Sequence, residues 1–117
     1  MNETEFKTRT RNLGLRVLRM ADALPKRPSM YAISRQLVRC ATSVGANYRA
    51  ACRAKSPADM LAKLAIVEEE ADETAYWLDL LAELEPPLSE RLQPLRQEAD
   101  EITAMIVASI KTLRTRG

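Results

Sequence analysis

Apolar residues recur three and four positions apart along most of the chain, which is the spacing of one face of an α-helix. The clearest example begins at Met30 and continues through Ile33, Leu37, Cys40, Val44, Asn47 and Ala51. This pattern predicts a helix over residues 29–54 with the amide of Asn47 inside its packed face. A buried amide without partners costs about 1–3 kcal/mol, so we expect Asn47 to be a buried structural residue that fixes the register of packing.

The same spacing predicts three more helices, over residues 4–24, 57–84 and 88–115. Prolines separate the first helix from the second and the third from the fourth, and Ser56 is a suitable N-cap for the third. The expected core face of the third helix is Leu61, Leu64, Glu68, Ala71, Ala75, Leu78 and Ala82. Short connections between long helices favour an all-α, antiparallel up-down-up-down four-helix bundle, and we expect one domain over residues 1–117.

A second set of apolar side chains lies away from these core faces. It comprises Ile66, Trp77, Leu80 and Leu84 on the third helix, with Leu15 and Leu18 as a weaker set on the first. Trp and Leu in such a patch are common anchors of protein interfaces, so we expect a homo-oligomer that uses these residues. The alternative is that Trp77 covers the end of its own bundle.

Composition narrows the class of protein. Three glycines and one phenylalanine in 117 residues disfavour a sheet, and no histidine is present. Neither a signal pattern nor a membrane-length apolar run is found, so a soluble, cytoplasmic protein without a membrane partner is expected. The two cysteines, Cys40 and Cys52, lack metal-ligand spacing and fit a reduced compartment.

The net charge of +2 conceals an unequal distribution along the chain. Residues 1–55 contain twelve Lys or Arg and three Asp or Glu, whereas residues 56–117 contain six and thirteen. Two interpretations are open. Basic helices can pack beside acidic ones and pair at their edges, or the basic half can present a surface to nucleic acid or an acidic partner.

The arginines of the predicted second helix are the candidate nucleic-acid-binding residues. Arg35, Arg39, Arg49 and Arg53 fall near one face, and the first helix adds Arg9, Arg11 and Arg16. Arginine forks onto phosphate, and a row of arginines with few acids nearby can follow a phosphate backbone of RNA or DNA. The alternative is that these residues pair with the Glu-rich third helix of a neighbouring subunit.

No catalytic constellation is evident, so we expect a protein that is not an enzyme and needs no cofactor. Glu68 and Asp72 lie one turn apart beside the expected core, but di-metal bundles normally include Glu-x-x-His motifs, and no metal site is expected here. We expect both to be buried structural carboxylates, with Glu68 accepting hydrogen bonds from Asn47, Tyr48 or an arginine of the second helix. Neither cysteine has a histidine to activate it.

Several short motifs resemble a known family over nearly the whole length. They are Leu-Pro at the end of the first helix, a Tyr31, Ile33, Gln36, Leu37, Arg39 pattern, the run Ser43-Val44-Gly45-Ala46-Asn47, the carboxylates after Leu64-Ala65-Ile66, and Tyr76-Trp77-Leu78. In their order and spacing these motifs are similar to the bacterial four-helix-bundle proteins named after 23S rRNA intervening sequences.

The resemblance implies a homo-oligomeric ring, a pentamer, with no known catalytic activity. A related branch resembles the accessory variability determinants of diversity-generating retroelements, which implies nucleic acid and a reverse transcriptase as partners. Two departures are visible. Arg49-Ala50-Ala51 stands where many members have Ala-Glu-Gly, so the role of that Glu does not carry over, and the aromatic-rich N-terminal segment is reduced to Phe6.

Overall fold

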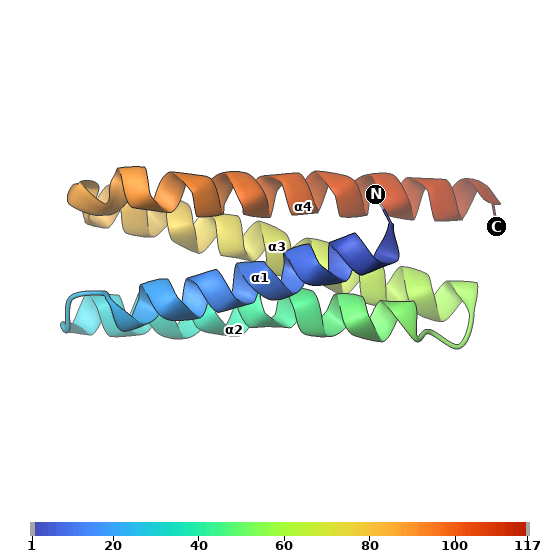
Figure 1. Cartoon of the computed structure of the whole chain (residues 1–117), viewed down its shortest axis with the longest axis horizontal. Helices are drawn as coiled ribbons and strands as arrows, with labels where there is room; N and C mark the ends of the chain where they lie inside the picture. The colour runs from blue at the N-terminus through green and yellow to red at the C-terminus, as the bar shows by residue number, and fades with distance from the viewer. Residues whose placement is uncertain (1, 117) are drawn as a thin grey trace.

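Four helices form an elongated antiparallel bundle in the computed structural model, which describes residues 2–116 (Figure 1). They are α1 (Glu3–Asp22), α2 (Pro28–Cys52), α3 (Pro57–Leu84) and α4 (Ser89–Arg116), and a short 3-10 turn, η1 (Pro86–Leu88), joins the last two. The connections alternate between the two ends, which confirms the up-down-up-down arrangement expected from the sequence. The bundle measures 47 × 20 × 20 Å.

Local chemistry explains where the helices begin. The side chain of Asn2 accepts a hydrogen bond from the Glu5 N–H at 2.7 Å, and Ser56 accepts one from the Asp59 N–H at 3.1 Å. Both side chains satisfy backbone donors that have no partner within the helix. Pro94 lies inside α4, which continues through it although its ring nitrogen donates no hydrogen bond.

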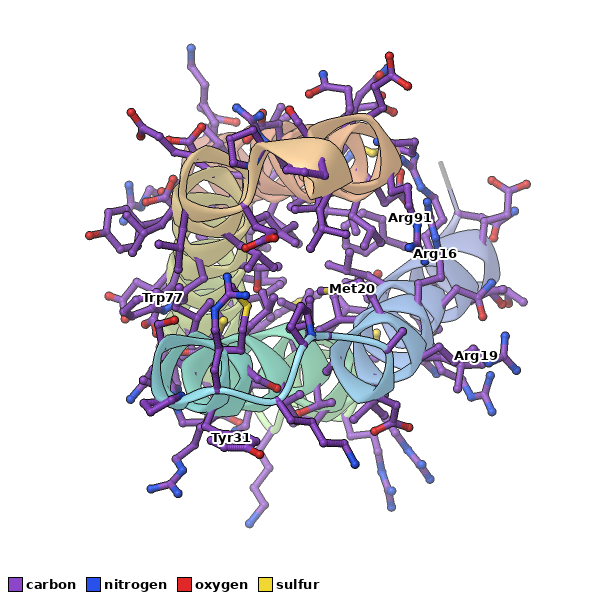
Figure 2. All side chains as sticks on the ribbon, turned by 90° about the vertical axis from the view of Figure 1, so that its left-hand side faces the viewer. Arg16, Arg19, Met20, Tyr31, Trp77 and Arg91 are labelled. Carbon is purple, nitrogen blue, oxygen red and sulfur yellow. The ribbon has the colours of Figure 1, made fainter. Side chains whose placement is uncertain are left out.

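Each helix packs against the next along the chain, and α1 also meets α4, so the four helices stand at the corners of a square (Figure 2). Helices α1 and α3 are diagonal, and no Cα atoms of the two lie within 8 Å of each other. The core contains the expected face of α2 almost in full, together with Leu92, Leu95, Ala99, Ile102, Ile106 and Ile110 of α4. Its largest fully buried side chains are Leu13, Val17, Met30, Leu37, Val44, Leu64, Val67, Leu78, Leu81, Leu92, Ile102 and Ile106.

The buried face of α3 is rotated from the one expected from the sequence. Val67, Thr74 and Leu81 are fully buried, whereas Glu68 and Ala75 are only half-buried. The apolar stripe of this helix is wide, so its spacing alone permits either orientation. Contact with both α2 and α4 selects the side that holds the larger aliphatic residues.

Helices α1 and α2 approach each other closely at two glycines. A Cβ atom on Gly45 would lie 3.2 Å from three backbone atoms of Thr10 and Arg11, and one on Gly14 would lie 3.4 Å from the Ala41 carbonyl oxygen and the Thr42 Cα. The absence of a side chain at Gly45 therefore allows the helix backbones to touch, whereas Gly14 leaves room for an ordinary contact. No helix within residues 2–116 has the length and apolarity needed to span a lipid bilayer.

Candidate nucleic-acid interface

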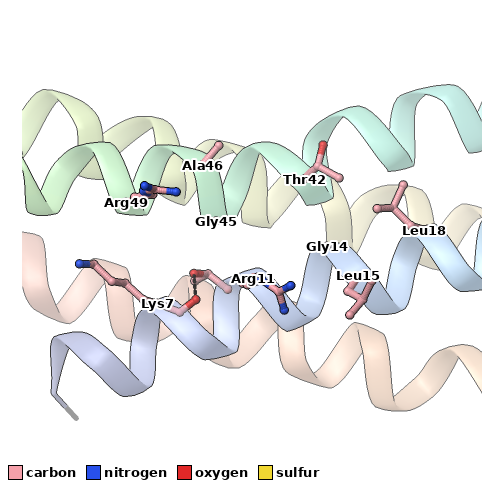
Figure 3. A pocket seen from close by; sticks show the side chains of 10 residues that line it. Lys7, Arg11, Gly14, Leu15, Leu18, Thr42, Gly45, Ala46 and Arg49 are labelled. Carbon is pink, nitrogen blue, oxygen red and sulfur yellow. Dashed lines mark hydrogen bonds between the residues drawn. The ribbon is translucent and has the colours of Figure 1, made fainter.

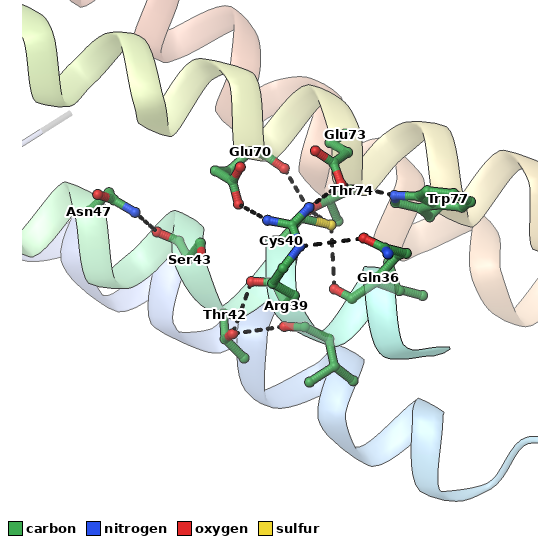
Figure 4. Close-up of polar contacts among 12 residues, drawn as sticks. Gln36, Arg39, Cys40, Thr42, Ser43, Asn47, Glu70, Glu73, Thr74 and Trp77 are labelled. Carbon is green, nitrogen blue, oxygen red and sulfur yellow. Dashed lines mark hydrogen bonds and ion pairs between the residues drawn. The ribbon is translucent and has the colours of Figure 1, made fainter. Parts of the chain in front are cut away.

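Arg39 is held by α3 of its own bundle. Its guanidinium donates to Glu70 Oε2 at 3.1 Å and to Glu73, and Trp77 Nε1 donates to the same Glu73 oxygen at 3.1 Å (Figure 4). The hydrogen bond to Glu73 raises the pKa of Arg39. Arg39 therefore pairs with the Glu-rich third helix, the alternative left open by the sequence, but with that helix in its own bundle rather than in a neighbouring subunit.

Arg9 has the corresponding role between α1 and α4. Its Nε donates to Glu98 Oε2 at 2.9 Å, and its Nη2 lies 3.1 Å from Glu101 Oε1. The hydrogen bond to Glu98 raises the pKa of Arg9, since the side-chain carboxylate stabilises the charged guanidinium. Two carboxylates of its own bundle therefore neutralise Arg9, as two others neutralise Arg39. The basic and acidic halves of the chain thus pair in part within one bundle.

Four of the seven candidate arginines share the outer face of α1 and α2. Arg35 and Arg49 on α2, Arg53 directly after its end, and Arg11 on α1 are exposed and make no ion pair within residues 2–116. Positions 35, 42 and 49 are seven residues apart, which places them along one line of the helix. Between Asp22 and Asp59 the chain contains no acidic residue, so α2 adds no carboxylate to this face.

Arg16 lies elsewhere. It is exposed, and the end-on view of Figure 2 places it on the side of α1 that is turned toward α4. The structure therefore separates it from the outer-face arginines. Met20, one turn further along α1, is half-buried against the core.

A furrow of about 660 Å³ runs between α1 and α2 on this outer face (Figure 3). Gly14, Gly45 and Ala46 line it at the helix crossing. Because the glycines have no side chain and that of alanine is small, the space above the crossing stays open. Toward one end of the furrow lie Lys7 and Arg49, Arg11 lies near its middle, and toward the other end lie Leu15 and Leu18. The furrow is thus basic at one end and apolar at the other.

The hydroxyl groups in the furrow are already engaged by the backbone. Thr10 Oγ1 donates to the Phe6 carbonyl at 2.9 Å, and Thr42 Oγ1 donates to the Val38 carbonyl at 2.7 Å. Lys7 makes an exposed pair with Glu3 at 3.1 Å, one turn away on the same helix. Such exposed pairs contribute little to stability, so the ammonium group can exchange this carboxylate for another anion.

The three polar residues expected to be buried behave differently from the prediction. Asn47 is half-buried, and its Nδ2 donates to the Ser43 carbonyl of its own helix at 2.9 Å (Figure 4), so it fixes no register between helices. Glu68 is half-buried and has no hydrogen bond from Asn47, Tyr48 or an arginine. Asp72 is exposed. The rotation of α3 moves both carboxylates to the rim, and Glu70 and Glu73 take the partnership with α2.

The two apolar sets occupy different faces. Leu80 and Leu84 are exposed (37% and 45%) near the half-buried Trp77, and Ile66, 41% exposed, lies three turns away along α3. Leu15 and Leu18 line the furrow on the diagonal helix α1. Trp77 packs against the core and edge-to-face against Tyr76, with ring centroids 5.0 Å apart. Its ring is therefore fixed in place beside the exposed leucines.

The furrow itself was missed by sequence reasoning. Lys7, Gly14, Gly45 and Ala46 were not candidates, although Gly14 and Gly45 are the only glycines inside predicted helices. An isolated glycine inside a helix is unfavourable by about 1 kcal/mol and often marks a close approach of another backbone. That signal was available. Which helix approaches each glycine is a matter of tertiary structure.

Chemistry at the remaining reactive groups is limited. Burial raises the pKa of the Cys40 thiol, whose sulfur accepts a hydrogen bond from Thr74 Oγ1 at 3.3 Å. Burial also raises the pKa of Cys52. Both thiols are therefore poor nucleophiles at neutral pH. Within residues 2–116, no three His, Cys, Asp or Glu side chains gather as metal ligands.

Comparison with known proteins agrees with this fold. The family described as 23S rRNA-intervening sequence protein matches residues 2–108. A crystal structure of a protein of unknown function from the S23 ribosomal protein family of Bacteroides thetaiotaomicron is 32% identical. It superimposes with a TM-score of 0.86 over 95% of this chain and 99% of that one. No curated protein matches the chain.

Proposed function

This chain belongs to the 23S rRNA-intervening sequence protein family, and we propose that it is a non-enzymatic protein that binds nucleic acid through the outer face of α1 and α2. The observation that carries the proposal is the set of exposed, unpaired arginines on that face, Arg11, Arg35, Arg49 and Arg53. Within the described residues, carboxylates neutralise Arg9 and Arg39 but not these four. A cytoplasmic location, where RNA and DNA are accessible, is part of the proposal.

The contact is electrostatic in the first instance. Arg35 and Arg49 are 14 residues apart on α2, which corresponds to about 21 Å at the rise of an α-helix, and Arg53 follows at the end of that helix. A phosphate backbone lying along α2 meets several guanidinium groups over that length. Each neutralised phosphate releases condensed counterions, so affinity depends steeply on salt.

We also propose that copies of the chain assemble through the exposed face of α3. Trp77, Leu80 and Leu84 supply the aromatic and aliphatic anchors that protein interfaces use. Repetition of the basic face around an assembly adds avidity to weak individual contacts. Because α1 and α3 are diagonal in the bundle, assembly through α3 leaves the basic face of each copy accessible.

The test is binding of the purified protein to labelled structured RNA and duplex DNA between about 50 and 200 mM salt. The double variant Arg35→Glu, Arg49→Glu should lose binding while its melting temperature and assembly state stay unchanged. The matched control reverses two exposed charges on α4, Lys111→Glu and Arg114→Glu, and keeps more of the affinity. Absence of binding by the wild-type protein at about 50 mM salt would refute the nucleic-acid proposal.

The alternative, a protein-interaction module whose arginines are used between subunits, predicts a different result from the same double variant. Static light scattering would then show that Arg35→Glu, Arg49→Glu dissociates the assembly. The assembly proposal has its own variant. Leu80→Glu with Leu84→Glu should yield monomers, and an unchanged mass in light scattering would contradict assembly through α3.

A further inference from the structure

The furrow between α1 and α2 is lined by charged residues toward one end and by apolar residues at the other. This difference limits the kind of nucleic acid that the furrow can bind. Lys7 and Arg49 lie at one end and Arg11 in the middle, whereas Leu15 and Leu18, the latter 39% exposed, lie at the other end (Figure 3). Phosphate oxygens match the cations, but they have no favourable contact with the leucines. The apolar end needs a partner with an apolar face.

The shape of the furrow adds a second constraint. It is an open hollow of about 660 Å³ above the crossing of α1 and α2 at Gly14 and Gly45, so an occupant lies in the groove along the two helices. A duplex presents its phosphates on a convex outer surface and keeps its bases stacked inside, out of reach of a hollow of this kind. An unpaired strand can place a phosphate at one end and turn a base or sugar into the other.

We infer that this furrow takes single-stranded nucleic acid, with phosphates at Lys7, Arg11 and Arg49 and an unpaired base against Leu15 and Leu18. The inference rests on the proposed nucleic-acid function and names the form of nucleic acid that the site selects. Arg53 follows the end of α2, four residues after Arg49, and Arg35 lies on α2 seven residues before Thr42, so the backbone of the strand meets a cation before and after the furrow.

Recognition here is independent of base sequence. The hydroxyls of Thr10 and Thr42 are bonded to backbone carbonyls of their own helices, and the Thr42 methyl group lies near Gly14. The other lining residues are cations, leucines, glycines and an alanine. These groups favour phosphate and apolar surface but do not distinguish the hydrogen-bonding edges of the bases.

Fluorescence anisotropy with the full chain tests the inference. The probes are a labelled mixed-sequence single strand of about 12 nucleotides and the corresponding duplex, each at about 50 mM salt. The wild-type protein should bind the single strand about tenfold more tightly than the duplex. Ala46→Phe places a ring in the furrow without changing charge, and it should abolish this preference. Ala104→Phe, at an exposed position on α4, is the matched control and should retain it.

Two further variants guard against misfolding as an explanation. Leu18→Gln should reduce the preference for the single strand and leave the salt dependence unchanged, because only an apolar contact is removed. For the single strand, Arg49→Gln should reduce the slope of log affinity against log salt concentration by the amount that corresponds to about one phosphate contact. Melting temperatures by circular dichroism verify that each variant is folded.

The outcomes separate the two proposals. Equal affinity for the two probes, or a preference that survives Ala46→Phe, overturns the single-strand inference and leaves nucleic-acid binding by the outer face in place. If neither probe binds at about 50 mM salt, the proposed function fails and the inference fails with it.

Discussion

Replacement of Gly45 by alanine should destabilise the bundle, whereas the same replacement at Gly14 should stabilise it. Both glycines lie inside helices at the crossing of α1 and α2. A Cβ atom on Gly45 meets the Thr10 carbonyl carbon and oxygen and the Arg11 nitrogen, all at 3.2 Å. On Gly14 the nearest atoms are at 3.4 Å, which is an ordinary van der Waals distance.

The magnitudes follow from two opposing effects. Alanine is favoured over glycine in a helix interior by about 1 kcal/mol, and this gain is available at both positions. At Gly14 little opposes it, so we expect a net stabilisation of about 0.5–1 kcal/mol. At Gly45 all three neighbours are backbone atoms, so α1 must shift as a unit by a few tenths of an ångström. Such overpacking costs about 1–3 kcal/mol, which leaves a net loss of up to about 2 kcal/mol.

Urea unfolding followed by circular dichroism measures both variants, at one protein concentration because assembly would contribute to stability. The expected midpoints are in the order Gly14→Ala, wild type, Gly45→Ala. Gly45→Ala should also weaken single-strand binding, because displacement of α1 changes the furrow. A Gly45→Ala variant that is as stable as Gly14→Ala would refute the argument that close backbone packing at Gly45 requires glycine.

Three other predictions concern charged and titrating groups. Arg9→Gln should lower the free energy of unfolding by about 1–2 kcal/mol in urea melts, because it leaves the largely buried Glu98 without a partner, while Arg16→Gln should have little effect. The hydrogen bond from Lys63 lowers the pKa of Asp59, so its contribution to stability is present at neutral pH and lost as the pH falls through that lowered pKa. Asp59→Asn should therefore be less stable than wild type at neutral pH and equal to it in acid, as measured by thermal melts across pH. The fully buried Cys40, whose pKa burial raises, should react with a thiol reagent only on unfolding, after Cys52 has reacted, as mass spectrometry of a time course would show.

The sequence by itself determined the class of fold and most of the core. Apolar residues spaced three and four positions apart give a helix one apolar face, and that face must be buried. Leu37, Cys40 and Val44 on α2, and Ile102 and Ile106 on α4, have this spacing, and all five are buried. The prolines and the Ser56 cap located the connections. The family resemblance of the Ser43–Asn47 run was also correct, since the match extends over residues 2–108.

The candidate site was predicted only in part, and the reason is the same for each error. Periodicity gives the angle of a side chain around its own helix but not the neighbour that it meets. Arg39 and Arg35 are four residues apart and looked equivalent, yet only Arg39 reaches Glu70 and Glu73, and Arg35 is exposed without an ion pair among the described residues. The wide apolar stripe of α3 likewise permitted a rotation that exposes Asp72 and buries Val67.

Tertiary structure alone decided which cations are neutralised and where the surface is hollow. Pairing of Arg9 with Glu98 depends on contact between helices that are about 90 residues apart in sequence. The furrow depends on how closely α1 and α2 approach at Gly14 and Gly45, which no single-helix pattern contains. Local spacing therefore determines what a helix can bury, and only the packing of helices against each other determines which side chains remain free to bind a partner.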